Sequence, residues 1–176
     1  MSSIELIRSM KLEHSLKKLV KECADKGIKI ATAESCTGGM ISEWITSVSG
    51  SSAVIEFGLC SYSNRIKHKI LGVREETLEK YTEYSEQCAE EMAKGALKVS
   101  GADYAVSTTG VAGPTGGTDK NPVGTVYICV CNKHSCETRR FNFEGEFFEL
   151  SRAEIRILAA KAALKMLSKM IRERGK

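Results

Sequence analysis

Hydrophobic residues recur along the chain in two alternating patterns, one typical of amphipathic helices and one typical of buried strands. Residues 4–26 carry apolar side chains at spacings of mostly three and four, which predicts a helix with one buried face. Gly27 is then a suitable helix-ending residue, and residues 28–33 (IKIATA) read as a buried strand. The alternation continues, so we expect helices at residues 40–48, 64–71, 74–80 and 85–100, and strands at residues 56–61 and 104–108.

The last third of the chain predicts a hairpin followed by a long helix. Residues 124–132 (GTVYICVCN) form an apolar run, a polar turn follows, and residues 136–143 return as the hairpin partner. Ser151 is a good N-cap for a final amphipathic helix. Helices that alternate with strands indicate one layered α/β domain over residues 1–176. The hairpin makes its mostly parallel sheet mixed.

Two polar loops with glycines each follow directly after a predicted strand. The first is ESCTGG at residues 34–39, and the second is TGVAGPTGGT at residues 109–118. Free backbone N–H groups at a helix start favour an anionic ligand, so the first loop suggests a phosphate or carboxylate cradle. It matches neither GxxxxGK[ST] nor GxGxxG, and a tight strand-to-helix turn remains the alternative. Two such loops favour a shared ligand crevice at the strand ends.

A third stretch, residues 50–67 (GSSAVIEFGLCSYSNRIK), brings a hydroxyl, a phenol and an amine close together in sequence. Ser51 and Ser52 precede the predicted strand, and Tyr62 and Lys67 follow it. A lysine can activate a serine nucleophile without any histidine. A polar strand end with a surface lysine would give the same spacing, so the spacing alone leaves both interpretations open.

Composition narrows the classes of function. The 176 residues are 42% hydrophobic and 27% charged, as in a soluble domain, and the net charge of +4 is spread along the chain, so no nucleic-acid partner is expected. No apolar run approaches the length of a membrane helix, and charges interrupt the apolar positions near the N-terminus, so neither a membrane contact nor a signal peptide is expected. The seven cysteines are therefore expected to be reduced thiols in the cytoplasm.

Four residues in the hairpin have a spacing that a zinc ion could use: Cys129, Cys131, His134 and Cys136. Cys129 and Cys131 share one face of a strand, and that face must be buried. Cysteine is a suitable small residue for a buried position. The core interpretation is favoured, and no metal is expected.

Several motifs, in order along nearly the whole chain, resemble the CinA C-terminal domain family, and in particular its stand-alone nicotinamide-nucleotide amidohydrolases. The motifs are TAESCTGG at 32–39, GSSA at 50–53, YSN with a following lysine at 62–67, LGV at 71–73, STTGVAGPTGG at 107–117 and PVGTVYI at 122–128. The resemblance implies hydrolysis of the carboxamide of nicotinamide mononucleotide to nicotinic acid mononucleotide and ammonia. A pyridine nucleotide is then the small-molecule partner, and no cofactor is needed.

The resemblance also implies roles for individual residues. By motif position the nucleophile falls on Ser52, with Ser51 and Ser35 as alternatives, the tyrosine on Tyr62 and the lysine base on Lys67. The residues implied to bind substrate are Ser35, Thr37, Gly38, Gly39, Thr109, Gly110, Gly113 and Arg152.

The chain departs from the family pattern at two places. Residues 82–85 read TEYS where the family usually has a glycine before VS, and residues 145–150 interrupt the motif that precedes Arg152. A binding module that keeps the nucleotide pocket without turnover, or a competence-associated partner protein, is therefore the alternative function. Exposed faces on the first helix would permit a homo-oligomer.

Overall fold

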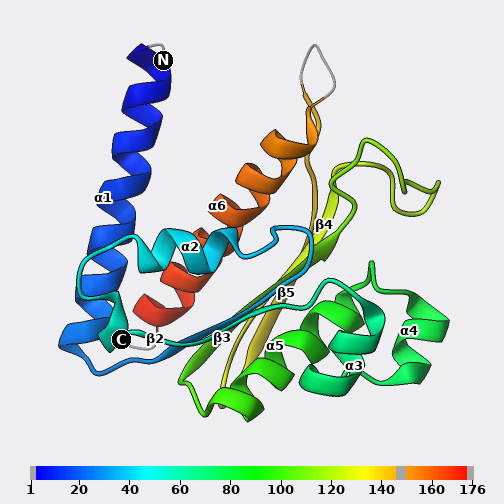
Figure 1. Ribbon diagram of the computed structural model, residues 1–176, viewed down its shortest axis with the longest axis horizontal. Helices are drawn as coiled ribbons and strands as arrows, with labels where there is room; N and C mark the ends of the chain where they lie inside the picture. The colour runs from blue at the N-terminus through cyan, green and yellow to red at the C-terminus, as the bar shows by residue number, and fades with distance from the viewer. Residues whose placement is uncertain (1–2, 146–149, 174–176) are drawn as a thin grey trace.

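In the computed structural model, which describes residues 3–145 and 150–173, five strands form one mixed sheet in the order β2-β1-β3-β4-β5 (Figure 1). The strands are β1 (Ile30–Glu34), β2 (Ile55–Cys60), β3 (Tyr104–Gly110), β4 (Thr125–Asn132) and β5 (Cys136–Asn142). β1 pairs in parallel with β2 and β3, whereas β4 is antiparallel to both β3 and β5. All strands except β4 thus run in one direction, which confirms the predicted mixed, mostly parallel sheet with a C-terminal hairpin.

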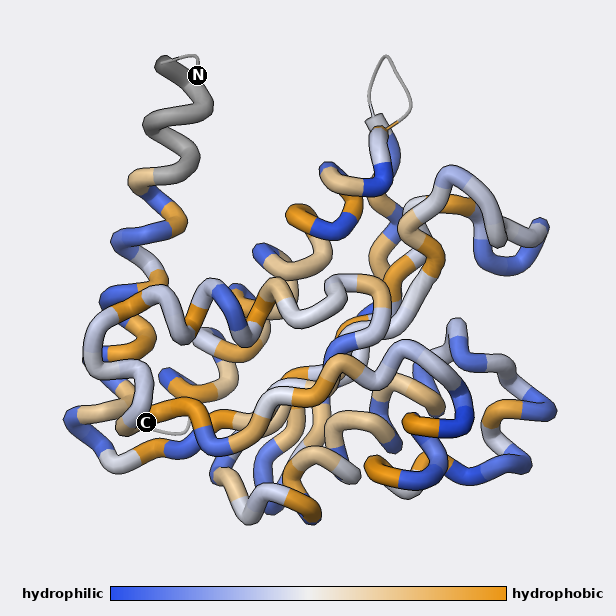
Figure 2. Tube along the Cα trace, in the orientation of Figure 1, coloured by the Kyte–Doolittle hydropathy of each residue, from blue (hydrophilic) through white to orange (hydrophobic). Residues whose placement is uncertain are grey.

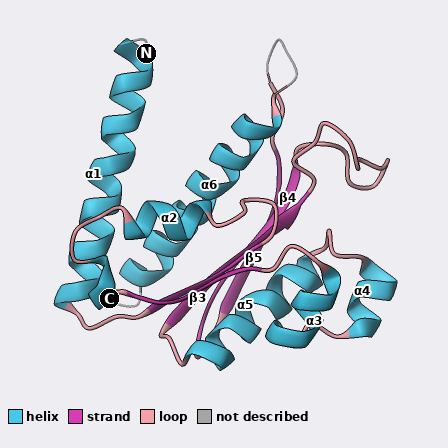
Figure 3. Ribbon diagram, in the orientation of Figure 1, coloured by secondary structure: helices cyan, strands magenta, loops and turns pink. Residues whose placement is uncertain are grey.

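Helices cover both faces of this sheet (Figure 3). One face carries α1 (Ser3–Asp25), α2 (Met40–Thr46) and α6 (Arg152–Glu173). The other carries α3 (Asn64–Leu71), α4 (Glu75–Tyr81) and α5 (Glu86–Ser100). A short 3-10 helix, η1 (Ser51–Ala53), precedes β2. The predicted layered α/β architecture is confirmed, including the long C-terminal helix.

Serine side chains cap the starts of α3, α5 and α6, and the cap at Ser151 was predicted from the sequence. The Ser85 hydroxyl accepts a hydrogen bond from the backbone N–H of Cys88 at 3.2 Å, and the Ser63 hydroxyl accepts one from Ile66 at 3.3 Å. At the start of α6, the Ser151 hydroxyl accepts from the N–H of Glu154 at 3.3 Å. Each cap satisfies one of the N–H groups that a helix start leaves without a partner.

Apolar side chains fill the space between the sheet and each helical layer. Every residue of β1 is buried, as expected of a central strand covered on both faces. Figure 2 shows hydrophobic residues concentrated along the strands, while the loop over residues 114–120 is mostly hydrophilic and exposed. Gly95 lets α5 lie directly against the end of α3, because a Cβ there would overlap the carbonyl oxygen of Leu71. Within the described residues, no helix has the length and hydrophobicity that a membrane span requires.

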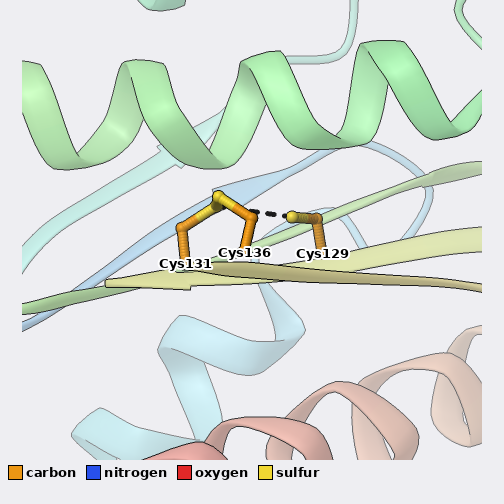
Figure 4. Close-up of side chains that lie close together, drawn as sticks. All are labelled: Cys129, Cys131 and Cys136. Carbon is orange, nitrogen blue, oxygen red and sulfur yellow. Dashed lines mark hydrogen bonds between the residues drawn. A yellow bond between two sulfur atoms is a disulfide. The ribbon is translucent and has the colours of Figure 1, made fainter. Parts of the chain in front are cut away.

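The hairpin corrects the expectation that all seven cysteines are free thiols. Cys131 and Cys136 are joined by a disulfide, and Cys129 lies beside them on β4 (Figure 4). The physical reason is register: Cys131 and Cys136 are direct partners across β4 and β5, with Cα atoms 4.1 Å apart.

The interrupted segment before Arg152 falls largely on residues 146–149, which lie outside the described residues.

Candidate active site

The loop that carries Ser35 is fixed at the carboxyl end of β1, between its two neighbouring strands. The backbone N–H of Ser35 donates to the carbonyl of Thr108 at 2.9 Å, and the N–H of Ser61 donates to the carbonyl of Glu34 at 2.7 Å. These bonds extend the strand pairing by one residue on each side. Ser35 therefore has a well-defined position at the sheet edge where β1, β2 and β3 end.

A buried carboxylate anchors the other end of this loop. Glu34 has no exposed surface, and its carboxylate accepts from the backbone N–H groups of Ile41 at 3.0 Å and Ser42 at 2.9 Å. A carboxylate at a helix start binds free N–H groups and interacts favourably with the helix dipole. Because Glu34 already occupies these donors, the start of α2 does not offer them to an external phosphate.

Three predicted binding residues of the first glycine loop, Thr37, Gly38 and Gly39, do not line the pocket that Ser35 lines. The Thr37 hydroxyl is buried against that of Thr108 at 2.7 Å, and the Thr37 carbonyl accepts from Arg156 at 2.9 Å. A Cβ on Gly38 would lie 3.2 Å from the Arg156 guanidinium. Gly38 and Gly39 have φ values of 62° and 91°, so they provide the left-handed turn into α2. Their role in the structure is that of a tight strand-to-helix turn.

Lys67 points from α3 into the protein interior toward Ser35. Only 1% of its surface is exposed, and its Nζ donates to Ser35 Oγ at 3.1 Å. The same Nζ lies 3.5 Å from the backbone carbonyl of Tyr62. A serine hydroxyl and a buried amine within hydrogen-bond reach have the geometry of a nucleophile and its base.

The surroundings of Lys67 favour its neutral form. Burial lowers the pKa of the Lys67 ammonium, because the interior solvates a charge poorly, while Cys88, Glu83 and Cys36 would raise it as anions. Burial also raises the pKa of both thiols, Cys36 and Cys88, to about 12. These two thiols are thus neutral near pH 7. Among Cys88, Glu83 and Cys36, only the Glu83 carboxylate then opposes the lowering of the Lys67 pKa by burial.

Arg152 and Tyr62 form the outer rim of the site. The Arg152 guanidinium donates to the Tyr62 phenol oxygen at 2.7 Å and to the carbonyl of Gly113 at 2.7 Å. Tyr62 is 62% exposed, so its phenol lies near the mouth of the pocket rather than beside Lys67. Arg152 joins the start of α6 to the loop after β3, although they are distant in sequence.

The second glycine loop, after β3, forms another wall. Gly110 passes so close to β4 that a Cβ would overlap the backbone at Thr125, and Gly113 has φ 74°. Thr109 is fully buried, and its hydroxyl donates to the carbonyl of Glu83 at 2.7 Å. Thr109 therefore supports the loop that precedes α5 instead of lining the pocket.

Sequence reasoning missed six residues that line the pocket, of which Cys36, Val111, Ala112 and Thr115 lie in the two glycine loops, whereas Glu83 and Tyr84 lie outside them. The departure TEYS at residues 82–85 was the signal that could have found Glu83 and Tyr84. Thr82 has φ 65°, a conformation rare for a β-branched residue. This backbone turn places Glu83 and Tyr84 beside the site, and Asn121 fixes the loop by donating to the Tyr84 carbonyl at 3.0 Å.

Together these segments enclose a hollow of about 100 Å³ at the carboxyl ends of the parallel strands. Its lining residues are Ser35, Cys36, Tyr62, Lys67, Glu83, Tyr84, Gly110, Val111, Ala112, Gly113, Thr115 and Arg152. Six of the predicted site residues therefore meet in one pocket. Ligand sites of open α/β sheets are expected at this edge.

Ser52 is not brought to Lys67. It lies in η1, exposed to solvent and before β2, whereas the pocket lies after the end of β2. The six residues of β2 span about 20 Å, at roughly 3.3 Å per residue. Ser51 is on the same turn, and its hydroxyl donates to the carbonyl of Thr46 at 3.3 Å. A whole strand therefore separates Ser52 from Lys67, whereas the Ser35 hydroxyl lies within hydrogen-bond reach of the lysine.

Comparison with known proteins agrees with this fold. A CinA-like protein of Syntrophomonas wolfei is 46% identical over 162 residues, which are 92% of this chain and 38% of that protein. The chain thus spans well under half the length of this curated relative. The solved competence/damage inducible protein CihA from Agrobacterium tumefaciens is 37% identical, with a TM-score of 0.83 over 89% of this chain and 93% of that one. A CinA superfamily protein from Klebsiella pneumoniae is 30% identical, with a TM-score of 0.85 over 92% and 98%.

The match to a protein-family model covers most of the chain. The CinA C-terminal domain matches residues 12–171, a range that includes all five strands and every residue of the pocket. We conclude that the chain belongs to the CinA C-terminal domain family.

Proposed function

We propose that this protein is an amidohydrolase that converts nicotinamide mononucleotide to nicotinic acid mononucleotide and ammonia, with Ser35 as the nucleophile and Lys67 as its base. The single observation that carries the proposal is the contact of 3.1 Å between Lys67 Nζ and Ser35 Oγ in a buried setting. The resemblance to nicotinamide-nucleotide amidohydrolases supplies the substrate class.

Each step of the reaction has a group to perform it. Neutral Lys67 accepts the hydroxyl proton as Ser35 Oγ attacks the carboxamide carbon, which forms a tetrahedral intermediate. The lysine ammonium then donates that proton to the leaving nitrogen, and the intermediate collapses to release ammonia and leave an ester on Ser35. A water molecule attacks this ester while neutral Lys67 accepts a proton from the water. The second intermediate collapses to the carboxylic acid product, and Lys67 returns the proton to the Ser35 oxygen.

An oxyanion must be stabilised in both tetrahedral intermediates. The loop over residues 110–113 lines the same pocket as Ser35. The Val111 N–H already donates to the carbonyl of Thr125 at 2.8 Å, so the other backbone N–H groups of this loop are the candidate donors. Gly110 and Gly113 let this loop pack closely against the protein, because a Cβ on Gly110 would overlap the backbone at Thr125 and one on Gly113 would overlap the side chain of Val123.

Arg152 is the proposed phosphate ligand of the substrate. It lies at the rim, and its guanidinium has five N–H donors, of which two are used by Tyr62 and Gly113. A phosphate at the mouth of the pocket would place the nicotinamide ring inward, toward Ser35. Tyr62 would orient Arg152 through the bond of 2.7 Å.

The test measures ammonia release from nicotinamide mononucleotide by the purified protein. We expect activity in the wild type, loss of at least about a hundredfold in Ser35→Ala, and full activity in the matched control Ser52→Ala. Loss of activity in Ser52→Ala with retention in Ser35→Ala would contradict the assignment. If the wild type binds the nucleotide and releases no ammonia, the chain is a binding module and the proposed function fails.

A further inference from the structure

A cluster of three cysteine sulfurs lies away from the pocket, on the face of the sheet that α5 covers. Cys129 and Cys131 project from the same face of β4, and Cys136 projects beside them from β5 (Figure 4). The three sulfur atoms lie within 4.8 Å of one another. Among the described residues this is the one group of three or more His, Cys, Asp or Glu side chains arranged to hold a metal ion.

The surroundings of the cluster suit a bound ion. The helix above it contributes the small residues Ala89 and Ala93 to the same buried cluster. Thr138 is the cross-strand partner of Cys129, and its Oγ1 is buried with no hydrogen-bond partner in the structure. Burial, together with the Glu90 and Glu137 carboxylates, raises the pKa of the Cys129 thiol to about 12, whereas the Thr138 hydroxyl and the Lys94 ammonium act in the opposite direction and favour the thiolate.

We propose that reduction of the Cys131–Cys136 disulfide converts this cluster into a three-thiolate site for a thiophilic divalent ion of the zinc type. A dithiol or phosphine reductant supplies two electrons, and two protons convert the disulfide to two thiols. The ion then binds three sulfurs and releases three protons, so the site carries one net negative charge. Three protein ligands leave the fourth position of a tetrahedral zinc ion to water.

The distances match this ion. Zinc–sulfur bonds of about 2.3 Å in a tetrahedron place two sulfurs roughly 3.8 Å apart. Cys129 Sγ and Cys131 Sγ are already 3.5 Å apart, so only the Cys136 side chain must move away when the disulfide opens. Cys136 is partly exposed and lines a surface hollow of about 580 Å³ with Lys94 and His134, which gives the ion a route from solvent.

Thr138 has the role of a supporting residue in this proposal. A hydroxyl that donates to a metal-bound thiolate stabilises the ligand, and removing such a partner typically weakens metal binding about 10–100-fold. The unpartnered Oγ1 then has an acceptor in the metal-bound state. Thr138→Val keeps the shape of the side chain and removes only this donor.

The experiment titrates Co²⁺, and then Zn²⁺ in competition, into protein reduced with a phosphine and freed of excess reductant. We expect one Co²⁺ per chain with thiolate-to-metal charge-transfer absorption, displaced by Zn²⁺, and no such band in the oxidised protein. Cys129→Ala should weaken binding at least about a hundredfold and Thr138→Val about tenfold. The control Cys60→Ala, at an exposed free cysteine, should bind as the wild type does.

Two outcomes would overturn the proposal. One is a reduced wild type that binds no Co²⁺ with a charge-transfer band, and the other is a Cys129→Ala variant that binds as tightly as the wild type. A second measurement does not depend on any variant folding. Zn²⁺ should protect Cys129, Cys131 and Cys136 of the reduced wild type from alkylation, as read by mass spectrometry of the peptides, and equal alkylation with and without Zn²⁺ would also refute the site.

Discussion

Replacing Lys67 tests the proposed base directly. Lys67→Arg keeps the positive charge and much of the length, whereas Lys67→Met keeps the length and removes the amine. Arginine has a pKa above about 12 and stays protonated at any usable pH, so it cannot accept the proton of Ser35. Both variants should therefore be nearly inactive, and Lys67→Arg should be no more active than Lys67→Met.

The expected loss follows from the geometry. Lys67 Nζ lies 3.1 Å from Ser35 Oγ, within the reach of a general base. Such a base contributes about 10²–10⁴-fold, which corresponds to about 2.7–5.4 kcal/mol of transition-state stabilisation. At the ordinary lysine pKa of about 10.4, only roughly one amine in 2,500 is neutral at pH 7, and each unit of lowering raises that fraction tenfold. The rate should thus rise with pH and level off below the ordinary lysine pKa, because burial lowers the pKa of Lys67.

The assay is the initial rate of ammonia release from nicotinamide mononucleotide, measured as kcat/KM across a pH series. Lys69→Arg, at an exposed lysine of the same helix, is the matched control and should behave as the wild type. Circular dichroism melts show whether each variant is folded. A folded Lys67→Arg that kept more than about a tenth of the wild-type kcat/KM would refute the reasoning, because a base contributes at least about a hundredfold.

Four further outcomes follow from the structure. Glu83→Gln should move the rise of the pH–rate profile to lower pH, because the carboxylate raises the pKa of Lys67; an unmoved midpoint would contradict this. Arg152→Ala should raise KM at least about tenfold for the nucleotide and little for the dephosphorylated nucleoside, since a charge-assisted contact contributes about 1.5–3 kcal/mol. Equal losses on both substrates would remove the phosphate role. EDTA should leave ammonia release unchanged, and inhibition reversed by zinc would show that the reaction needs a metal. Gly95→Ala should lower the free energy of unfolding in urea by about 1–3 kcal/mol, because its Cβ would overlap the carbonyl of Leu71, and an unchanged midpoint would show that α3 can shift freely.

The hairpin shows what spacing along one strand could and could not predict. Two cysteines at positions 129 and 131 must share a face of a strand, and the sequence predicted that they would be buried. Which residue of the returning strand lies opposite them depends on register, which the turn and the packing of both faces decide. The disulfide between Cys131 and Cys136 was therefore not predicted, although both residues were noted as a group with Cys129.

The position of Ser52 relative to Lys67 shows a similar limit. Ser52 was placed next to Lys67 because both lie in one short stretch, yet one precedes β2 and the other follows it. A strand is extended, so residues on its two ends are about 20 Å apart for six residues. Ser35, by contrast, is distant in sequence and follows β1, whose carboxyl end lies beside that of β2. The spacing of motifs along the chain thus did not show at which end of a strand each residue would lie.

The sequence alone was enough to predict the layered α/β fold, the order of its elements and the edge of the sheet that holds the pocket. It could do so because hydrophobic periodicity is local, and because parallel strands bring their carboxyl ends, with Ser35, Tyr62 and Gly110, to one side. The burial of Lys67, and the presence of Glu83 and Tyr84 in the same pocket, became visible only in the folded chain. The physical reason is that burial depends on surrounding segments: the neighbours of Lys67 come from residues scattered between positions 35 and 88. A lysine therefore has a lowered pKa only where the packed chain removes its water.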